Sequence, residues 1–161
     1  AQAAWSALDF AERAVAAGST PDADALAQLA RAIGGTIHLR SMFARSDAAW
    51  QTANAIERAL AIDPAHADAH TTRAVLRLRL ATLPGIARLF AGDTPEASLE
   101  TALADAGFAC ASEPSVENRL LLAKILDATG RSEEAQATHE QARTSSPAFP
   151  RDAVLQATLD D

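Results

Sequence analysis

Three prolines at related intervals constrain the fold of this chain more than any other feature. Pro114 and Pro147 are 33 residues apart, and Pro64 and Pro114 are 50 residues apart. Since a helical hairpin that repeats along a solenoid takes about 34 residues, the longer interval fits one hairpin plus an insertion of about 16 residues. The spacing therefore predicts stacked helical hairpins, each covering part of its neighbour's apolar face.

The composition agrees with a purely helical fold. Alanine fills 41 of the 161 positions, tyrosine is absent, and there are only four valines and six isoleucines. Because β-branched and aromatic residues build sheets, we expect an all-α protein. Antiparallel helices that approach to about 8–10 Å need small residues at their contacts. We expect Ala102, Ala109, Ala123, Ala135 and Ala142 at such contacts.

The charge and hydropathy of the sequence limit the kinds of partner that this chain can bind. The net charge of −7 argues against a nucleic-acid surface, which needs a concentrated basic face. Apolar stretches are too short and too often interrupted by arginine to predict a transmembrane segment. The sequence begins at Ala1 without methionine, which favours removal of a preceding segment and an exported location over a cytoplasmic one. An alanine-rich chain with thirteen arginines and one lysine suggests a GC-rich bacterial source.

Helix start and stop signals divide the chain as a single repeat domain. In the first hairpin we expect one helix from Asp22 to Phe43, kinked or closely packed at Gly34-Gly35, and a second helix capped by Ser46-Asp47. The expected parts are an N-terminal helix (1–21), a first hairpin (22–64), a second hairpin (67–114) with an insertion (82–95), a third hairpin (115–147) and a C-terminal capping helix (148–161).

Signals in the second half predict further boundaries. The helical pattern resumes at Glu96 after the insertion. Ser115 and Ser132 are the expected N-caps of the third hairpin's two helices, and Gly130 closes the first of them. The insertion carries Leu89-Phe90, and it forms either a lid over a groove or a plug between repeats.

The third unit reads Leu122-Ala123-x-x-Leu126, then Gly130, Ala135 and Pro147. This pattern resembles the tetratricopeptide repeat, with small residues where helices touch and large ones where they interlock. The resemblance implies a right-handed α-solenoid of about three hairpins with capping helices.

The sequence of the insertion points to one family among the tetratricopeptide-like proteins. Leu83-Pro84-Gly85 and the segment from Pro95 to Leu103 are similar to the inserted hairpin of the regulator of microtubule dynamics family, a tetratricopeptide-like group with bacterial relatives. The similarity covers residues 48–147. It implies a folded scaffold that binds a protein or peptide partner. The family's link to microtubules does not carry over to a bacterial source.

A second resemblance stays open. Residues 56–64, preceded by the glycine-interrupted segment 32–37, are similar to exported tetratricopeptide-like accessory subunits of tripartite solute transporters. Those subunits pair with a periplasmic solute-binding protein. The insertion fits them less well.

The first helix of each hairpin in such a solenoid lines a concave groove, and an extended or helical peptide could lie there. Transferring the repeat period along the chain gives one set of candidate partner-binding residues per hairpin. These are His38, Ser41 and Arg45, then Thr72, Val75 and Arg79, then Leu121 and Lys124.

Two histidines raise the question of a metal site. His66 and His70 are four residues apart, with Asp63 and Asp68 nearby. No third ligand has a diagnostic spacing, so a polar helix start is the favoured interpretation and no metal or cofactor is expected. His38 and His139 lack an identifiable catalytic partner, and the sequence has no phosphate-binding glycine loop. The chain is therefore expected to be non-catalytic.

Four arginines bracket the insertion in an otherwise acidic protein: Arg73, Arg77, Arg79 and Arg88. Arg73 and Arg77 share a predicted helix face. Such arginines could recognise a peptide carboxylate. The alternative is ion pairing with Glu96, Glu100 or Asp105, or a solvated surface.

Overall fold

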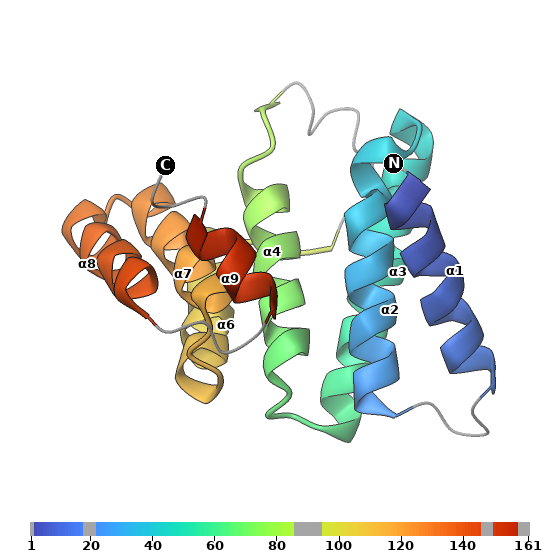
Figure 1. Cartoon of the computed structure of the whole chain (residues 1–161). Coiled ribbons are helices and arrows are strands. Elements are labelled where there is room, and N and C mark those ends of the chain that lie inside the picture. Colours follow the sequence, from blue (N-terminus) through green and yellow to red (C-terminus); the bar gives the residue numbers. More distant parts are fainter. Residues whose placement is uncertain (1, 18–21, 86–94, 146–149, 158–161) are drawn as a thin grey trace.

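The computed structural model describes residues 2–17, 22–85, 95–145 and 150–157 (Figure 1). Within these ranges the secondary structure consists of helices. They are α1 (Gln2–Ala17), α2 (Ala23–Thr36), the short 3-10 helix η1 (Ile37–Leu39), α3 (Met42–Ile62), α4 (Ala67–Ala81), α6 (Leu99–Ser112), α7 (Val116–Ala128), α8 (Ser132–Thr144) and α9 (Pro150–Ala157).

The helices pair as successive hairpins. Helix α2 packs on α3, α4 on α6, and α7 on α8. Helix α1 lies against α2 at one end of the stack, and α8 forms the other end (Figure 1). Helix α9 lies against α7 on the side that faces α4. None of the helices in the described ranges is long and apolar enough to cross a bilayer.

Three groups of buried side chains hold the stack together. Leu8 and Ile33 join α1 to α2, and Ala48 of α3 packs with them. A second group, which includes Leu26, Ile56 and Leu76, lies between α2, α3 and α4. A third group joins α4, α6 and α7 around Leu78, Ala106 and Ile125. Each inner hairpin therefore shares apolar surface with its neighbours, as expected of a solenoid.

Alanines lie where the helices approach each other. The five predicted contact alanines are at most 7% exposed, so that prediction is confirmed. Gly34 serves the same purpose between α2 and α3, since a Cβ built there would lie 3.5 Å from Cγ2 of Thr52. Small residues thus set the spacing of the helices, and leucine and isoleucine fill the neighbouring gaps.

The first hairpin turns earlier than predicted. Helix α2 ends at Thr36, and Ser46 and Asp47 lie inside α3 rather than capping it. The predicted helix from Asp22 to Phe43 is therefore wrong. The chain breaks at Arg40 and Ser41, whose ψ angles are both 156°. These extended residues end the helical path, and α3 then runs for 21 residues.

The other boundaries are closer to expectation. The side chain of Ser115 accepts a hydrogen bond from the backbone of Asn118, which confirms that cap. Gly130 closes α7 with a φ of 78°, as predicted. Ser132 is the first residue of α8 rather than its cap, because the Gly130 turn places Arg131 at that position. Helix α6 begins at Leu99 instead of Glu96, because Ser98 and Thr101 form a reciprocal capping box. Residues 86–94 of the insertion, including Leu89-Phe90, lie outside the described ranges.

Candidate functional site

The first helices of the three hairpins form the inner face of the solenoid. Helices α2, α4 and α7 lie side by side and run in the same direction (Figure 1). Their N-caps Asp22, His66 and Ser115 each accept a hydrogen bond from the backbone N–H three residues later. Because the caps match, residues at equal steps from them occupy equivalent positions on the three helices.

One end of the inner face is acidic. Two residues after each cap stand Asp24, Asp68 and Glu117. Negative side chains are favourable here, because the N-terminal end of a helix carries a partial positive charge. Arg31 of α2 joins this end to the neighbouring helices: it pairs with Glu117 of α7, and its Nη1 lies 3.6 Å from Asp68 of α4. Burial alone would lower the pKa of Arg31, but Glu117 and the other acidic neighbours outweigh it and raise the pKa.

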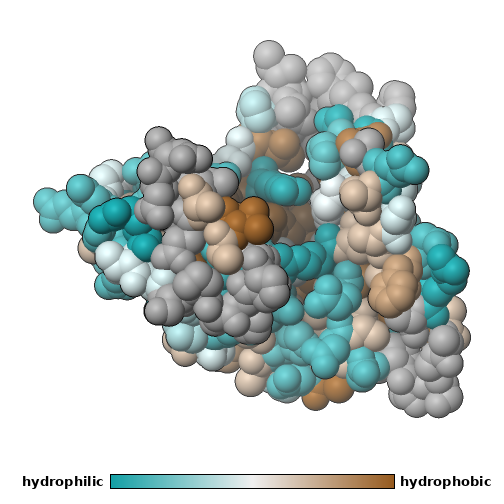
Figure 2. Space-filling view, in the orientation of Figure 1, coloured by the Kyte–Doolittle hydropathy of each residue, from teal (hydrophilic) through white to brown (hydrophobic). Residues whose placement is uncertain are grey.

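A cleft of about 240 Å³ lies where α2, α4 and α7 meet. Thr71 Oγ1 donates a hydrogen bond to Asn118 Oδ1 at 2.8 Å, which fixes α4 against α7. In the space-filling view the surface is hollowed between the α9 side and the α2 side, and both hydrophilic and hydrophobic residues border the hollow (Figure 2). The residues around the cleft are Arg31, Gly34, Gly35, Ile37, Thr52, Thr71, Thr72, Val75, Leu76, Arg79 and Glu117.

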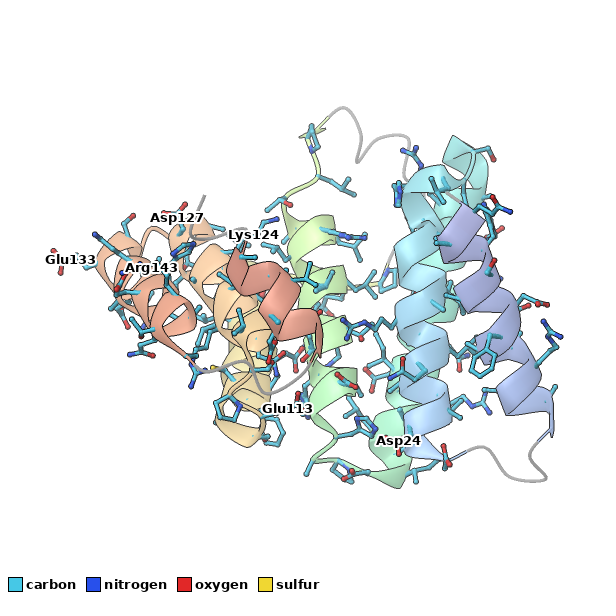
Figure 3. The ribbon with its side chains drawn as sticks, in the orientation of Figure 1. Asp24, Glu113, Lys124, Asp127, Glu133 and Arg143 are labelled. Carbon is cyan, nitrogen blue, oxygen red and sulfur yellow. The ribbon has the colours of Figure 1, made fainter. Side chains whose placement is uncertain are left out.

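The opposite end of the inner face is basic. Arg79 Nη1 of α4 donates to the Gly34 carbonyl of α2 at 3.4 Å. Arg45 of α3 donates to the carbonyls of Arg40 and His38, at 3.2 and 3.3 Å. The acidic end can be followed in Figure 3, where Asp24 lies near the lower end of α2. The inner face is therefore polarised along the helix axes.

The structure brings together some of the predicted binding residues. Thr72, Val75 and Arg79 line the cleft. His38 lies in η1 and Arg45 in the first turn of α3, so both sit at the basic end beside Arg79's contact on α2. Ser41 precedes α3 at its N-cap and makes no side-chain capping bond.

The two candidates on α7 lie elsewhere on that helix. Leu121 packs partly against the core group between α4 and α7. Lys124 is exposed and lines a separate groove of about 590 Å³ between α7 and α8. Neither residue reaches the cleft.

In the first hairpin, the period of 34 residues does not lead to the positions equivalent to Thr72, Val75 and Arg79. Measured from the caps, the counterparts of Thr72, Val75 and Arg79 are Gln28, Arg31 and Gly35, which precede them by 44 residues. The extra length comes from α3, which has 21 residues against 13 in α8 of the third hairpin, and from η1, which precedes α3. Aligning the capping residues instead of the prolines would have found these positions.

The histidines do not converge on a metal. His66 Nε2 lies 2.9 Å from Asp24 Oδ1, while its Nδ1 accepts from the backbone of Ala69. His70 lies between Asp105 and the Pro64 carbonyl, each 3.0 Å from a ring nitrogen. Among the described residues no group of three His, Cys, Asp or Glu side chains could hold a metal ion.

Two of the four bracketing arginines pair with a buried carboxylate. Arg73 Nη2 lies 2.8 Å from Asp105 Oδ1, and Arg77 Nη1 lies 2.5 Å from Asp105 Oδ2. Burial would lower the pKa of Arg73, but its hydrogen bond to Asp105 and its other acidic contacts raise it. The expected alternative of ion pairing with Asp105 is therefore what these two residues do. Arg88 lies outside the described ranges.

Comparisons with known proteins place the chain among helical repeat proteins. The sequence model of the family described as "Regulator of microtubule dynamics protein 1-3" matches residues 2–161. A crystal structure of a thermophilic TPR protein from Thermus thermophilus is similar, with a TM-score of 0.68 and 20% identity over 94% of this chain and 70% of that one. No curated protein matches the sequence significantly. The predicted all-α, tetratricopeptide-like fold is thereby confirmed.

Proposed function

The chain belongs to the regulator of microtubule dynamics protein 1-3 family, as residues 48–147 predicted, and we propose that it is a non-catalytic scaffold that binds a peptide segment of a protein partner. A fold of stacked helical hairpins is suited to this role, because its curvature creates an extended concave surface. The observation that carries the proposal is the cleft where α2, α4 and α7 meet.

The cleft has the chemistry of a peptide site. Thr72, Val75 and Leu76 provide apolar and hydroxyl contacts, and Arg31 and Arg79 stand at its two ends. Helix α4 takes about 16 Å to advance from Asp68 to Arg79. About five residues of an extended peptide cover that length.

The two candidate metal ligands, His66 and His70, have structural partners. His70 contacts Asp105 and stacks on Phe108, with ring centroids 4.2 Å apart. His66 caps α4. These contacts support a role in packing rather than in chemistry, in line with a scaffold that uses no cofactor.

A peptide library tests the proposal. Peptides of about twelve random residues displayed on phage are selected against the full chain, and the dissociation constants (Kd) of the enriched peptides are measured by calorimetry. We expect Val75→Glu, which places a charge in the cleft, to raise the Kd at least about tenfold, or about 1.4 kcal/mol. Ile62→Glu is the matched control, because Ile62 is 54% exposed at the far end of α3. Absence of enriched peptides, or equal Kd values for both variants and the wild type, contradicts the proposal.

A further inference from the structure

Three guanidinium groups surround the C-terminal end of α2, and each comes from a different element. Arg79 reaches it from α4 and binds the Gly34 carbonyl. Arg40 follows η1, and its Nε donates to Thr36 Oγ1 at 3.2 Å. Arg45 extends back from α3 to the carbonyls of His38 and Arg40. We call Arg40, Arg45 and Arg79 the arginine cluster.

The cluster differs from the arginines in the described ranges that pair with carboxylates, and Arg119, which binds the Pro114 carbonyl and the Ser145 hydroxyl, resembles the cluster members in this respect. Six arginines there form ion pairs with carboxylates, namely Arg13, Arg31, Arg73, Arg77, Arg131 and Arg143. Cluster members instead bind carbonyl and hydroxyl oxygens, and Arg40 also lies over the Trp5 ring at 5.3 Å. In a chain of net charge −7, three such cations at one place need a physical reason.

Capping of α2 explains only part of this charge. The C-terminal end of a helix carries about half a negative charge, whereas three arginines bring about three positive charges. The four hydrogen bonds to protein oxygens use four of the roughly fifteen N–H groups that three guanidinium groups offer. The remaining donors can bind carboxylates, and an arginine fork matches a carboxylate in two parallel bonds.

We propose that the inner face selects a peptide with an acidic end, and that this end binds the arginine cluster while the rest of the peptide lies in the cleft. This inference rests on the proposed function. Arg79 connects the two parts, because it lines the cleft and belongs to the cluster. Asp24, Asp68 and Glu117 fix the direction, because these three carboxylates outnumber Arg31, which pairs with two of them. The net negative charge that remains disfavours acidic residues at that end of the inner face.

The same polarity disfavours long polyanions. A nucleic acid carries negative charge along its whole length. Laid along the inner face, it would bring phosphates against Asp68 and Glu117 as well as against the cluster. An acidic peptide with one uncharged half avoids this repulsion, so a peptide is the occupant that fits both ends.

A fluorescent octapeptide with three consecutive glutamates at one end and five uncharged residues tests the inference by fluorescence anisotropy on the full chain. We expect its Kd to be at least about tenfold lower than that of the peptide with glutamines in place of the glutamates, which is about 1.4 kcal/mol. A peptide of the same composition with dispersed glutamates should also bind more weakly. Raising the salt concentration from about 50 to about 500 mM, a range that screens exposed charges, should raise the Kd.

Substitutions in the arginine cluster test whether it causes the preference for the glutamate peptide. The double variant Arg45→Gln and Arg79→Gln should raise the Kd for the glutamate peptide about tenfold. Because Arg79 also lines the cleft, the Kd for the glutamine peptide should rise as well, but by much less. Arg58→Gln is the matched control, because Arg58 is an exposed arginine of α3 roughly 20 Å along that helix from Arg45. The double variant Arg45→Lys and Arg79→Lys keeps the charge and should retain most of the affinity, which separates loss of charge from loss of fold.

Equal Kd values for the glutamate and glutamine peptides overturn the inference, as does an equal loss in Arg58→Gln. Tighter binding of polyuridylate than of the glutamate peptide also overturns it. If library peptides bind and depend on Val75 while the arginine variants change nothing, the inference fails and the proposed function stands. If no peptide of any composition binds, the proposed function itself fails.

Discussion

At the scale of single residues, Asp105 is the most consequential charge in the interior. It is 4% exposed and accepts from Arg73 and Arg77 of α4, and His70 also contacts it. Buried ion pairs contribute little relative to an apolar replacement, but removing one partner leaves the others desolvated and unpaired. The ion pairs of Asp105 therefore add little net stability, but loss of this carboxylate would leave the arginines of α4 partly buried and without this partner. For this reason Asp105 is important for the packing of α6 against α4.

Replacing Asp105 with alanine should lower the free energy of unfolding by about 3 kcal/mol. The estimate is at the low end for buried pairs, because Arg73 keeps its contact with Glu57. Urea denaturation followed by circular dichroism measures the change. Glu134→Ala, which removes an exposed pair with Arg131, should leave the midpoint nearly unchanged. Equal effects of the two substitutions would contradict this account of Asp105.

Cys110 illustrates a residue whose reactivity is set by burial. Desolvation raises the pKa of its thiol above the usual value of 9.0, and the positive charge of Arg119 offsets part of the rise. Because the thiolate is the reactive form, Cys110 should react with iodoacetamide more slowly at pH 8 than a free thiol does. The inflection of its pH–rate profile should lie at a higher pH than that of an exposed thiol, because its pKa is raised.

Arg119→Gln sharpens the test of Cys110, because it removes the charge that stabilises the thiolate. The pKa should rise further and the reaction at pH 8 should slow further. Chain unfolded in urea should react as an ordinary thiol. A pH profile with its inflection at or below that of the unfolded chain would contradict the prediction.

At the scale of the elements, the helix ends decide the geometry of the hairpins. Gly130 has a φ of 78°, and the backbone N–H of Arg131 donates to the Leu126 carbonyl across it. This left-handed residue ends α7 and reverses the chain into α8. A side chain at this position is strained, because the Cβ atom crowds the following carbonyl.

Gly130→Ala should therefore destabilise the fold by about 1–2 kcal/mol. Gly107→Ala is the matched control, since Gly107 lies inside α6 and a Cβ there would meet nothing within 4 Å. That substitution should stabilise the fold by about 0.5–1 kcal/mol, because alanine favours the helix over glycine. Thermal unfolding of the two variants should shift in opposite directions, and a shift in the same direction would contradict the assignment of the Gly130 turn.

Element lengths also explain what could be predicted from the sequence. Proline spacing and alanine content were sufficient for stacked helical hairpins, because both report local geometry that repeats. The inner-face positions of the second hairpin followed, since Thr72, Val75 and Arg79 line the cleft. The helix boundaries of the first hairpin could not be predicted, because α3 is longer than its counterparts. In addition, Ser46-Asp47 has the residue types of a helix cap, and no local signal shows that the two residues lie inside a helix. The arginine cluster could not be predicted, because Arg40, Arg45 and Arg79 meet only through tertiary packing around α2.

At the scale of the whole molecule, the hairpins share apolar groups in sequence along the stack. Ile56 belongs to the group between α2, α3 and α4, and Ile125 to the group between α4, α6 and α7. Helix α4 contributes side chains to both groups, so it couples the stability of the half that contains α2 and α3 to that of the half that contains α6 and α7. Solenoids of this kind open locally, because each repeat contacts only its neighbours.

Ile56→Ala and Ile125→Ala test how far that coupling extends. Both side chains are fully buried, so each truncation should cost about 2–5 kcal/mol in its own layer. Hydrogen exchange measured by mass spectrometry should accelerate in α6, α7 and α8 for Ile125→Ala and stay near the wild-type rate in α1 and α2. Ile56→Ala should give the reverse pattern, with the largest change in α2 and α3. One contact opposes this independence of the two halves of the stack: the ion pair of Arg31, which joins α2 directly to Glu117 of α7. Uniform acceleration in both variants would mean that this contact and α4 couple the chain into one cooperative unit, and local opening of the hairpins would then be wrong.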